Sequence, residues 1–165
     1  MKTLASIAIC FILSISFGIS QDFDYSFSEK YTVSTPAQLS VSSSDGNIDV
    51  ISSTGNEIKV YYIARKDGKL LKIDRKELEK EVTLEVSQNG NRLEISVRHK
   101  ENFSSWNMNQ VNVSFKIFTP SETTGILHTS DGNIALSGLS GDQECKTSDG
   151  NIGISEVKGH ATGIT

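Results

Sequence analysis

The chain has 165 residues, with 16 Lys and Arg against 20 Asp and Glu, which gives a formal net charge of −4. Apolar residues make up 36 % of the chain and aromatic residues 7 %. This composition is lean for an enzyme, yet too apolar and too weakly charged for a disordered chain. The mild acidity offers no basic patch for DNA or RNA, so we expect no nucleic-acid partner. One domain is the expectation for this length.

The N-terminus is typical of a secretory signal peptide. Lys2 is followed by an apolar run over residues 4–17, which is too short to span a bilayer, and small residues precede Gln21. We predict a signal peptide over residues 1–20 and a mature chain over residues 21–165. The protein would then be secreted or extracytoplasmic, in the periplasm or at the cell surface. A retained membrane anchor is the alternative. The mature chain has no second apolar span, so we expect no integral membrane span after cleavage.

Two cysteines are present, and the first of them, Cys10, would leave with the signal peptide. Only Cys145 then remains, so no disulfide can form within the mature chain. We expect Cys145 to be buried as a small apolar side chain.

Strand and helix patterns follow along the first half of the chain. Residues 57–64 alternate between apolar and polar side chains, which predicts a strand, and the turn-forming residues 53–56 before them predict a hairpin. Residues 70–80 are rich in Lys, Glu and Leu. They predict either a short helix capped by Asp74 or a solvated charged loop.

Two more patterns follow before the chain returns to its repeats. Alternating segments at residues 82–86 and 93–97 flank Asn89-Gly90-Asn91, a strong hairpin signal. Residues 111–117 alternate as a further strand, which ends at a Thr-Pro pair. We expect this middle region to be an insertion between repeats and not a separate domain.

The pentapeptide Ser-Asp-Gly-Asn-Ile occurs at residues 44–48, 130–134 and 148–152. The last two copies are 18 residues apart, and positions outside the pentapeptide keep this period, as Leu139 and Val157 do. A fixed period of this kind is the mark of a repeat architecture.

Each repeat predicts a turn and then a short strand. Glycine adopts positive φ freely, and Asp and Asn can bond to nearby backbone, so we assign structural turn roles to nine residues. Alternating apolar residues after each turn predict a strand with one buried face. The nine turn residues are Asp45, Gly46, Asn47, Asp131, Gly132, Asn133, Asp149, Gly150 and Asn151.

One such unit cannot bury its apolar face alone, whereas units stacked about 4.8 Å apart would share a continuous core. The sequence therefore predicts an all-β fold, a single-stranded, β-helix-like β-solenoid of repeats of about 18 residues with a hairpin insertion. A β-sandwich of meandering strands is the alternative, because Asp-Gly turns would also suit it.

The repeated Asp-Gly-Asn-Ile motifs resemble the bacterial putative-adhesin family of β-strand-repeat proteins, a domain of unknown function. The signal peptide and the strand patterns at residues 57–65 and 111–120 are similar to that family too. The resemblance covers about residues 30–165 and implies an extracytoplasmic β-solenoid from a bacterium. The array stops at Thr165, where another unit would begin, so we expect the domain to be truncated at its C-terminus.

Asp45, Asp131 and Asp149 would stack on successive turns of such a fold. Stacked carboxylates repel one another, so either solvent and turn hydrogen bonds relieve the repulsion or a cation such as calcium bridges them. Turn capping is the favoured interpretation. A calcium-stapled secreted solenoid is the alternative, and we expect no other cofactor.

Trp106 lies in a polar segment and is the candidate for stacking on a glycan. Packing over the end of the core is the alternative role for its ring. Tyr61 and Tyr62 are further aromatic candidates.

The three histidines show no metal-ligand spacing, and we find no nucleophile or phosphate-loop motif, so we expect no catalytic residues. We predict an exported, non-catalytic β-repeat protein, an adhesin or a surface-binding and scaffolding module. Its partner would be a cell-surface or extracellular glycan or protein. A polysaccharide-processing β-helix enzyme is the alternative, and a groove with paired acids about 5–10 Å apart would favour it.

Overall fold

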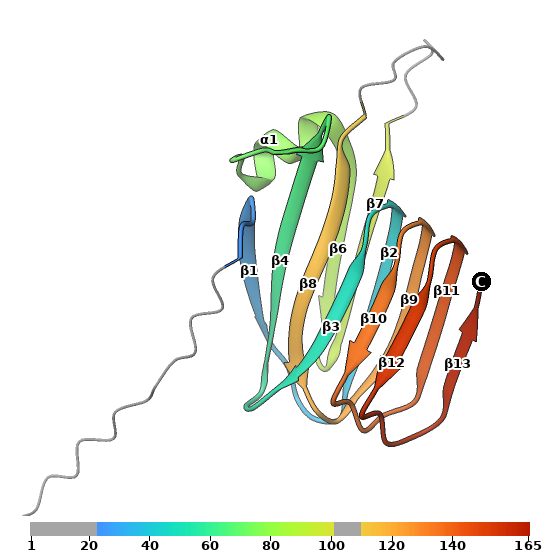
Figure 1. Ribbon diagram of the computed structural model, residues 1–165. Helices are drawn as coiled ribbons and strands as arrows, with labels where there is room; N and C mark the ends of the chain where they lie inside the picture. The colour runs from blue at the N-terminus through green and yellow to red at the C-terminus, as the bar shows by residue number, and fades with distance from the viewer. Residues whose placement is uncertain (1–22, 101–109) are drawn as a thin grey trace, which may run out of the picture.

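Residues 23–100 and 110–165 are described by the computed structural model, and they form two mixed β-sheets that face one another, with one short helix (Figure 1). The prediction of a β fold is confirmed at this level. Sheet A has the strand order β1-β4-β8-β3-β10-β12, with β5 beside β4. Sheet B has the order β13-β11-β9-β2-β7-β6.

The bounds of the elements follow the alternating segments of the sequence. The strands of sheet A are β1 (Phe27–Thr32), β3 (Ile48–Ser53), β4 (Glu57–Lys66), β5 (Lys69–Leu70), β8 (Asn112–Pro120), β10 (Ile134–Ser137) and β12 (Ile152–Ser155). Sheet B and the helix comprise β2 (Ala37–Asp45), β6 (Val82–Asn89), β7 (Arg92–His99), β9 (Thr123–Asp131), β11 (Gln143–Asp149), β13 (Ala161–Ile164) and α1 (Arg75–Glu81).

The core lies between the two sheets and is built from every second residue of the long strands. In β4, for example, Ile58, Val60, Tyr62 and Ala64 are all 0 % exposed. Burying one such aliphatic or aromatic side chain stabilises the fold by roughly 1.5–3 kcal/mol. The alternation that predicted a strand at residues 57–64 is therefore the alternation between core and surface.

The strand predicted at residues 57–64 is β4, and the strand predicted at residues 111–117 is β8. The predicted hairpin around Gly90 is also confirmed. β6 and β7 pair antiparallel from Val82 opposite His99 to Asn89 opposite Arg92.

The hairpin predicted at residues 53–56 is wrong, although a turn does lie there. β3 and β4 do not pair with each other, because β8 lies between them, parallel to β3 and antiparallel to β4. Turn-forming residues indicate that the chain changes direction, but they do not indicate which strand the following segment pairs with. A strand from much later in the chain takes the central place.

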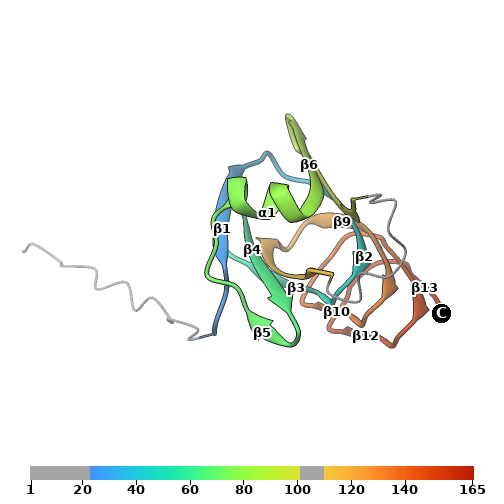
Figure 2. The ribbon, with the colours of Figure 1, turned by 90° about the horizontal axis from the view of Figure 1, so that it is seen from above.

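Residues 75–81 form the helix α1, so the prediction of a short helix is confirmed and the alternative of a charged loop is wrong. Asp74 is its N-cap: the Asp74 carboxylate accepts the Glu77 backbone N–H at 2.9 Å, and the Glu77 carboxylate accepts the Asp74 N–H at 3.1 Å. Leu78 is the one buried residue of the helix. Seen from above, α1 lies across one end of the molecule between β1 and β6 (Figure 2).

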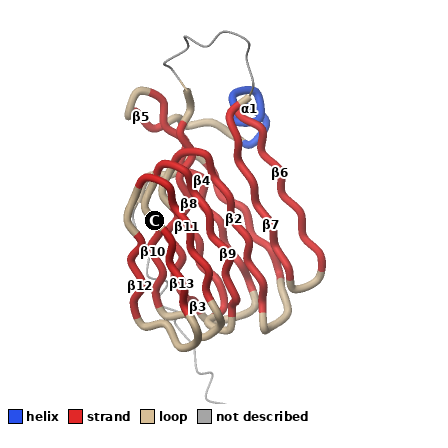
Figure 3. The backbone as a smooth tube through the Cα atoms, turned by 90° about the vertical axis from the view of Figure 1, so that its right-hand side faces the viewer, coloured by secondary structure: helices blue, strands red, loops and turns tan. Residues whose placement is uncertain are grey.

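The repeats pair in parallel with an offset of one period. Ile134 in β10 pairs with Ile152 in β12, and Thr129 in β9 pairs with Thr147 in β11. The first copy joins the same rows, because Ile48 in β3 pairs with Ile134. Figure 3 shows these strands side by side in the two layers. Each Asp-Gly-Asn motif is a corner at which the chain passes from sheet B to sheet A.

The predicted signal peptide, residues 1–20, and Cys10 lie outside the described residues. Within residues 23–100 and 110–165, no helix is both long enough and apolar enough to cross a membrane. Cys145 is a free thiol in the core and is 0 % exposed, as predicted.

Candidate functional site

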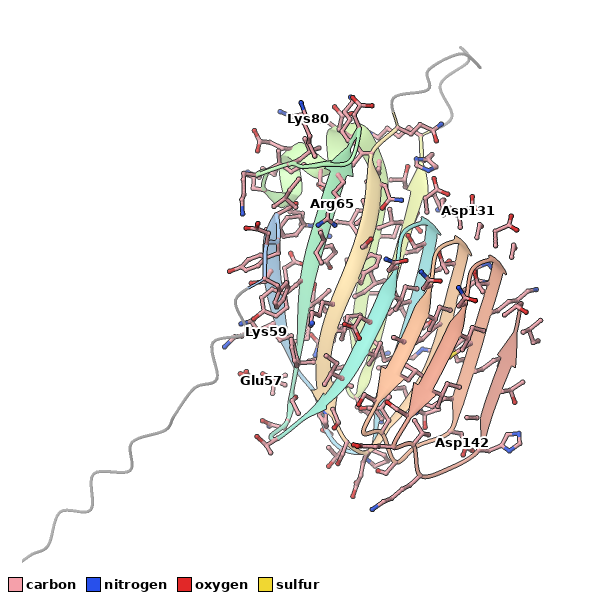
Figure 4. The ribbon with its side chains drawn as sticks, viewed as in Figure 1. Glu57, Lys59, Arg65, Lys80, Asp131 and Asp142 are labelled. Carbon is pink, nitrogen blue, oxygen red and sulfur yellow. The ribbon has the colours of Figure 1, made fainter. Side chains whose placement is uncertain are left out.

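The three Asp-Gly-Asn corners stack on one another at one end of sheet B. Asp45 is in register with Asp131, and Asp131 is in register with Asp149. We call these three residues the Asp column. Figure 4 labels Asp131 at this end of the strands. The structure thus brings together the three carboxylates that the sequence singled out.

The glycines of the corners are needed mainly because the backbones approach closely. A Cβ on Gly132 would lie 2.3 Å from the carbonyl oxygen of Gly46, and a Cβ on Gly150 would lie 2.0 Å from that of Gly132. Only Gly46 among the three has a positive φ, of 135°. The expectation that positive φ explains all three glycines is therefore wrong for the second and third, where steric contact with the preceding corner is the reason.

The asparagines form a ladder along the stack. The Asn47 side-chain oxygen accepts the backbone N–H of Asn133 at 2.8 Å. The Asn133 oxygen accepts the N–H of Asn151 at 2.9 Å and its side-chain amide at 3.2 Å. Asn47 and Asn133 therefore each satisfy a backbone donor of the next corner, which supports the structural role predicted for these residues.

The carboxylates of the Asp column lie in different surroundings. Asp45 contacts the His99 imidazole through Oδ2 and Nε2, whereas Asp131 is exposed. A hydrogen bond with Asp45 is the main cause that raises the pKa of Asp131, followed by desolvation and by the charges of Asp45 and Asp149. His99 is a partner that sequence reasoning missed, since nothing in the spacing relates residues 45 and 99.

Among residues 23–100 and 110–165, no group of three or more His, Cys, Asp or Glu side chains is arranged to hold a metal ion. Within the Asp column, the contact between Asp45 and His99 is the one ion pair with a cationic side chain among the described residues. The calcium alternative gains no support from the geometry of the three carboxylates.

A cluster of rings covers part of the outer face of sheet A. We call Phe23, Tyr25, Tyr61 and Phe118 the aromatic cluster. Tyr61 is its centre, with ring centroids 4.8 Å from Phe23, 4.8 Å from Tyr25 and 5.9 Å from Phe118, all edge to face. Tyr25 is 38 % exposed and is the most open ring of the four.

Lysines border the aromatic cluster. The Lys59 ammonium lies 4.4 Å from the centroid of the Tyr61 ring, and the Lys116 ammonium lies 4.9 Å from that of Phe23. Lys116 is also 3.5 Å from Asp49. Figure 4 labels Glu57, Lys59 and Arg65 along β4, the strand that carries Tyr61. Cations over ring faces are attracted by the negative π surface, so rings and charges form one mixed surface here.

Tyr62 points the other way and belongs to the core. It is 0 % exposed and stacks on Phe27 with centroids 4.4 Å apart. Its hydroxyl donates to Glu29 at 3.0 Å, Tyr31 donates to the same carboxylate at 2.5 Å, and Arg75 donates to it at 3.1 Å. This network fastens β1 to the start of α1 and leaves Tyr62 no role at the surface.

The described surface also has open pockets. One, of about 460 Å³, is lined chiefly by Ser and Thr hydroxyls around Pro120 and carries a single carboxylate, Glu122. Another, of about 310 Å³ on β2, β6 and β7, contains Glu85 and Glu94. Glu85 is ion-paired with Arg98 at 2.9 Å, and Glu94 is ion-paired with Arg92 at 2.5 Å.

Trp106, the predicted glycan-stacking residue, lies outside the described residues. The signal that could have found the aromatic cluster is that two outward positions of the alternating strands β4 and β8, residues 61 and 118, carry aromatic rings among polar and charged neighbours. Tyr61 and Phe118 alternate with the core residues Val60, Tyr62 and Ile117. A strand that needs only one buried face does not require apolar residues on the other.

Comparison with known proteins gives structural neighbours only. No protein-family model matches the sequence, and no curated protein matches it. A putative cell adhesion protein from Clostridium sporogenes matches with 8 % identity and a TM-score of 0.31, over 84 % of this chain and 97 % of that one. A putative adhesin from Bacteroides fragilis matches with 13 % identity and a TM-score of 0.29, over 84 % of this chain and 95 % of that one.

Proposed function

We propose that the protein is an exported, non-catalytic β-repeat protein that binds or scaffolds at the cell surface, as an adhesin does. The signal-peptide pattern of residues 1–20 supports export to the periplasm or the cell surface. The aromatic cluster on the outer face of sheet A is the observation that carries the binding role.

The architecture behind this role is proposed to be a β-solenoid. A coil is one strand in sheet B, an Asp-Gly-Asn corner and one strand in sheet A, so that β2–β3, β9–β10 and β11–β12 are three coils. The parallel registers with an 18-residue offset support this arrangement, as do the glycine contacts and the asparagine ladder between corners. Each coil buries its apolar face only against its neighbours.

The chemistry of the aromatic cluster favours a glycan as the partner. The C–H face of a sugar ring can pack against an exposed aromatic ring, and Tyr25 is such a ring. The neighbouring lysines can donate to sugar hydroxyls or to the carboxylates of acidic sugars. The aromatic cluster lies on the face of a β-sheet, and the sheet holds its rings in a fixed arrangement.

A non-catalytic role agrees with the state of the grouped acids. Glu85 and Glu94 line the same groove, and each forms an ion pair with an arginine, Arg98 and Arg92 respectively. The Glu29 carboxylate is likewise occupied by two tyrosines and an arginine.

Binding of the mature chain to bacterial cell-wall glycan, measured by co-sedimentation and on a glycan array, tests the proposal. Tyr25→Ala should weaken binding by about two- to thirteenfold, because one aromatic ring contact is worth about 0.5–1.5 kcal/mol. Ile126→Ser is the matched control, since Ile126 is 50 % exposed on sheet B, away from the cluster. If both variants bound as tightly as the native chain, the aromatic cluster would not be the binding site. Binding that is lost after protease treatment of the cell walls, with no binding on the glycan array, would indicate a protein partner.

A further inference from the structure

Three lysines border the aromatic cluster from three adjacent strands of sheet A. In the antiparallel registers, Lys59 of β4 lies opposite Lys30 of β1 on one side and opposite Phe118 of β8 on the other. Lys116 of β8 lies opposite Tyr61, two residues further along β4 and therefore on the same face as Lys59. Positive charge is thus gathered on this face, although the chain as a whole has a formal net charge of −4.

Lys30 and Lys59 form a like-charge pair between neighbouring strands. Residues directly opposite each other in an antiparallel pair have their Cβ atoms about 4.5–5.5 Å apart, and like charges at such positions are destabilising. The pair therefore opposes the pairing of β1 with β4 unless a negative charge lies beside it. Local rules of this kind are broken chiefly where a residue serves a function.

The carboxylates around the aromatic cluster do not neutralise Lys59. Three of them each form an ion pair with another lysine, and the pairs are Glu57 with Lys30 at 3.6 Å, Asp49 with Lys116 at 3.5 Å and Asp24 with Lys72 at 3.2 Å. Within residues 23–100 and 110–165, Lys59 forms no ion pair, and its ammonium lies against the Tyr61 ring instead, 4.4 Å from the centroid. Lys59 is therefore the cation of this face whose charge is left unbalanced by the described residues.

One ligand can reach both Lys59 and an exposed ring. The Tyr25 ring and the Lys59 ammonium both lie against Tyr61, with the Tyr25 centroid 4.8 Å from that of Tyr61. Tyr25 is 38 % exposed, so the C–H face of a pyranose ring can pack on it. The complementary ligand thus carries a sugar ring and a negative charge a few ångströms apart. A uronic acid has this chemistry, because its carboxylate is attached directly to the pyranose ring.

We infer that the aromatic cluster and Lys59 together bind a polyuronate, a glycan whose sugars carry carboxylate groups. The Lys59 ammonium donates to a sugar carboxylate, and the Tyr25 ring packs on the same sugar or on the next one. A neutral glycan would leave Lys59 without a counter-charge, and a polymer of alditol phosphates would offer charge without a pyranose ring. The inference rests on the glycan-binding role proposed above and specifies the charge of that glycan.

Binding of the mature chain to matched polymers tests the inference. Polygalacturonate and alginate are the probes, since they are polyuronates that differ in stereochemistry and linkage. The methyl ester of each keeps the rings and removes the charge, whereas poly-L-glutamate keeps the charge and has no sugar rings. Measured by biolayer interferometry at physiological salt, at least one polyuronate should bind about tenfold or more tightly than its methyl ester and than poly-L-glutamate.

Lys59→Gln should weaken binding to that polyuronate by about three- to tenfold, as expected for the loss of one charged contact at a partly exposed site. Binding to the methyl ester should not change, because the ester offers Lys59 no charge. Lys146→Gln is the matched control and should bind like the native chain. It removes the same charge from an exposed position in β11 of sheet B, away from the aromatic cluster.

Equal affinity for a polyuronate and its methyl ester would overturn the inference and leave glycan binding as such intact. Equal affinity for poly-L-glutamate, or an equal loss of affinity in Lys59→Gln and Lys146→Gln, would also overturn it, because charge alone would then suffice. Binding to neutral glycans but to neither polyuronate would contradict the inference only. Binding to no glycan, charged or neutral, would overturn the proposed function as well.

Discussion

The side-chain oxygen of Asn133 accepts the backbone N–H of Asn151 at 2.9 Å, across an offset of 18 residues. The same bond joins Asn47 to Asn133 at 2.8 Å, across 86 residues. Asn133 therefore donates its backbone N–H to Asn47 and accepts the backbone N–H of Asn151 with its side-chain oxygen. The two ends of the ladder are not equivalent, because Asn47 is only an acceptor in it and Asn151 only a donor.

Asn133→Ala should lower the free energy of unfolding by about 1–2 kcal/mol, because the Asn133 oxygen accepts two hydrogen bonds from Asn151 and each is typically worth about 1 kcal/mol. Asn151→Ala is the matched control and should cost less, because the Asn151 oxygen accepts no N–H in the described residues. Urea denaturation of both variants measures the difference. Equal losses would mean that the ladder bond itself contributes little.

Gly132→Ala should be strongly destabilising, by about 1–3 kcal/mol or more, because the added Cβ would meet the Gly46 carbonyl oxygen at 2.3 Å. Gly153→Ala makes the same chemical change in β12, where a Cβ would meet nothing within 4 Å. That variant should be neutral or slightly stabilising. Thermal unfolding compares them, and similar Tm values for the two variants would contradict the steric explanation.

Asp131→Asn should raise stability at neutral pH. The pKa of Asp131 is raised in the folded state, so folding holds its proton more tightly and its ionisation opposes folding. The stabilising contribution of the protonated form is complete below the ordinary carboxyl pKa and is lost as pH rises through the raised value. The gain from Asp131→Asn should therefore shrink as the pH falls into the acidic range.

Tm measured between acidic and neutral pH checks this prediction. Glu144→Gln is the control, because its neighbours in adjacent strands are Ile126 and Thr162 and carry no like charge. If the difference in Tm between Asp131→Asn and the native chain did not change with pH, repulsion between the carboxylates of the Asp column would not be its cause.

Glu29→Gln should destabilise the protein by about 2 kcal/mol, the range for hydrogen bonds to a charged group. Burial alone would raise the pKa of Glu29, but hydrogen bonds from Tyr31, Arg75 and Tyr62 outweigh it and lower the pKa below its usual value. The ionised carboxylate therefore stabilises the fold above the ordinary carboxyl pKa, and this stability is lost as pH falls through the lowered one.

Chemical denaturation at neutral and acidic pH measures this effect. Tyr62→Phe removes only one donor to the same carboxylate and should cost less, about 1 kcal/mol. If Glu29→Gln and the native chain showed the same stability at neutral pH, the network would not anchor β1.

Cys145 should not react with a thiol reagent in the native protein. It is 0 % exposed, and burial together with the charge of Glu144 raises its pKa to about 11, so little thiolate forms at mildly alkaline pH. Labelling with a chromogenic disulfide should be slow in buffer and complete in urea. Fast labelling of the folded chain would show that β11 opens readily.

The sequence predicted the fold best where one local pattern decides the structure. The alternation in β4, the Asn-Gly turn of the β6–β7 hairpin and the Asp74 cap of α1 are all readable within ten residues. Pairings that join distant segments were not readable. Neither the insertion of β8 between β3 and β4 nor the contact of His99 with Asp45 leaves a trace in local spacing.

The candidate site divides in the same way. The repeated motif predicted that Asp45, Asp131 and Asp149 would stack, since an internal repeat carries long-range information in its period. The aromatic cluster was missed because its rings come from three separate segments. Only the tertiary fold brings Phe23, Tyr61 and Phe118 together.

The position of β2 between β7 and β9 has a consequence for how quickly the chain can fold. β2 finds its partners at residues 92–97 and 123–131, so the middle of sheet B closes only after more than half of the chain has been synthesised. Pairings over such long loops give a high contact order, and high contact order slows folding. Until β9 and β10 are synthesised, β2 and β3 each keep one unpaired edge, which exposes the chain to pairing with the wrong strand.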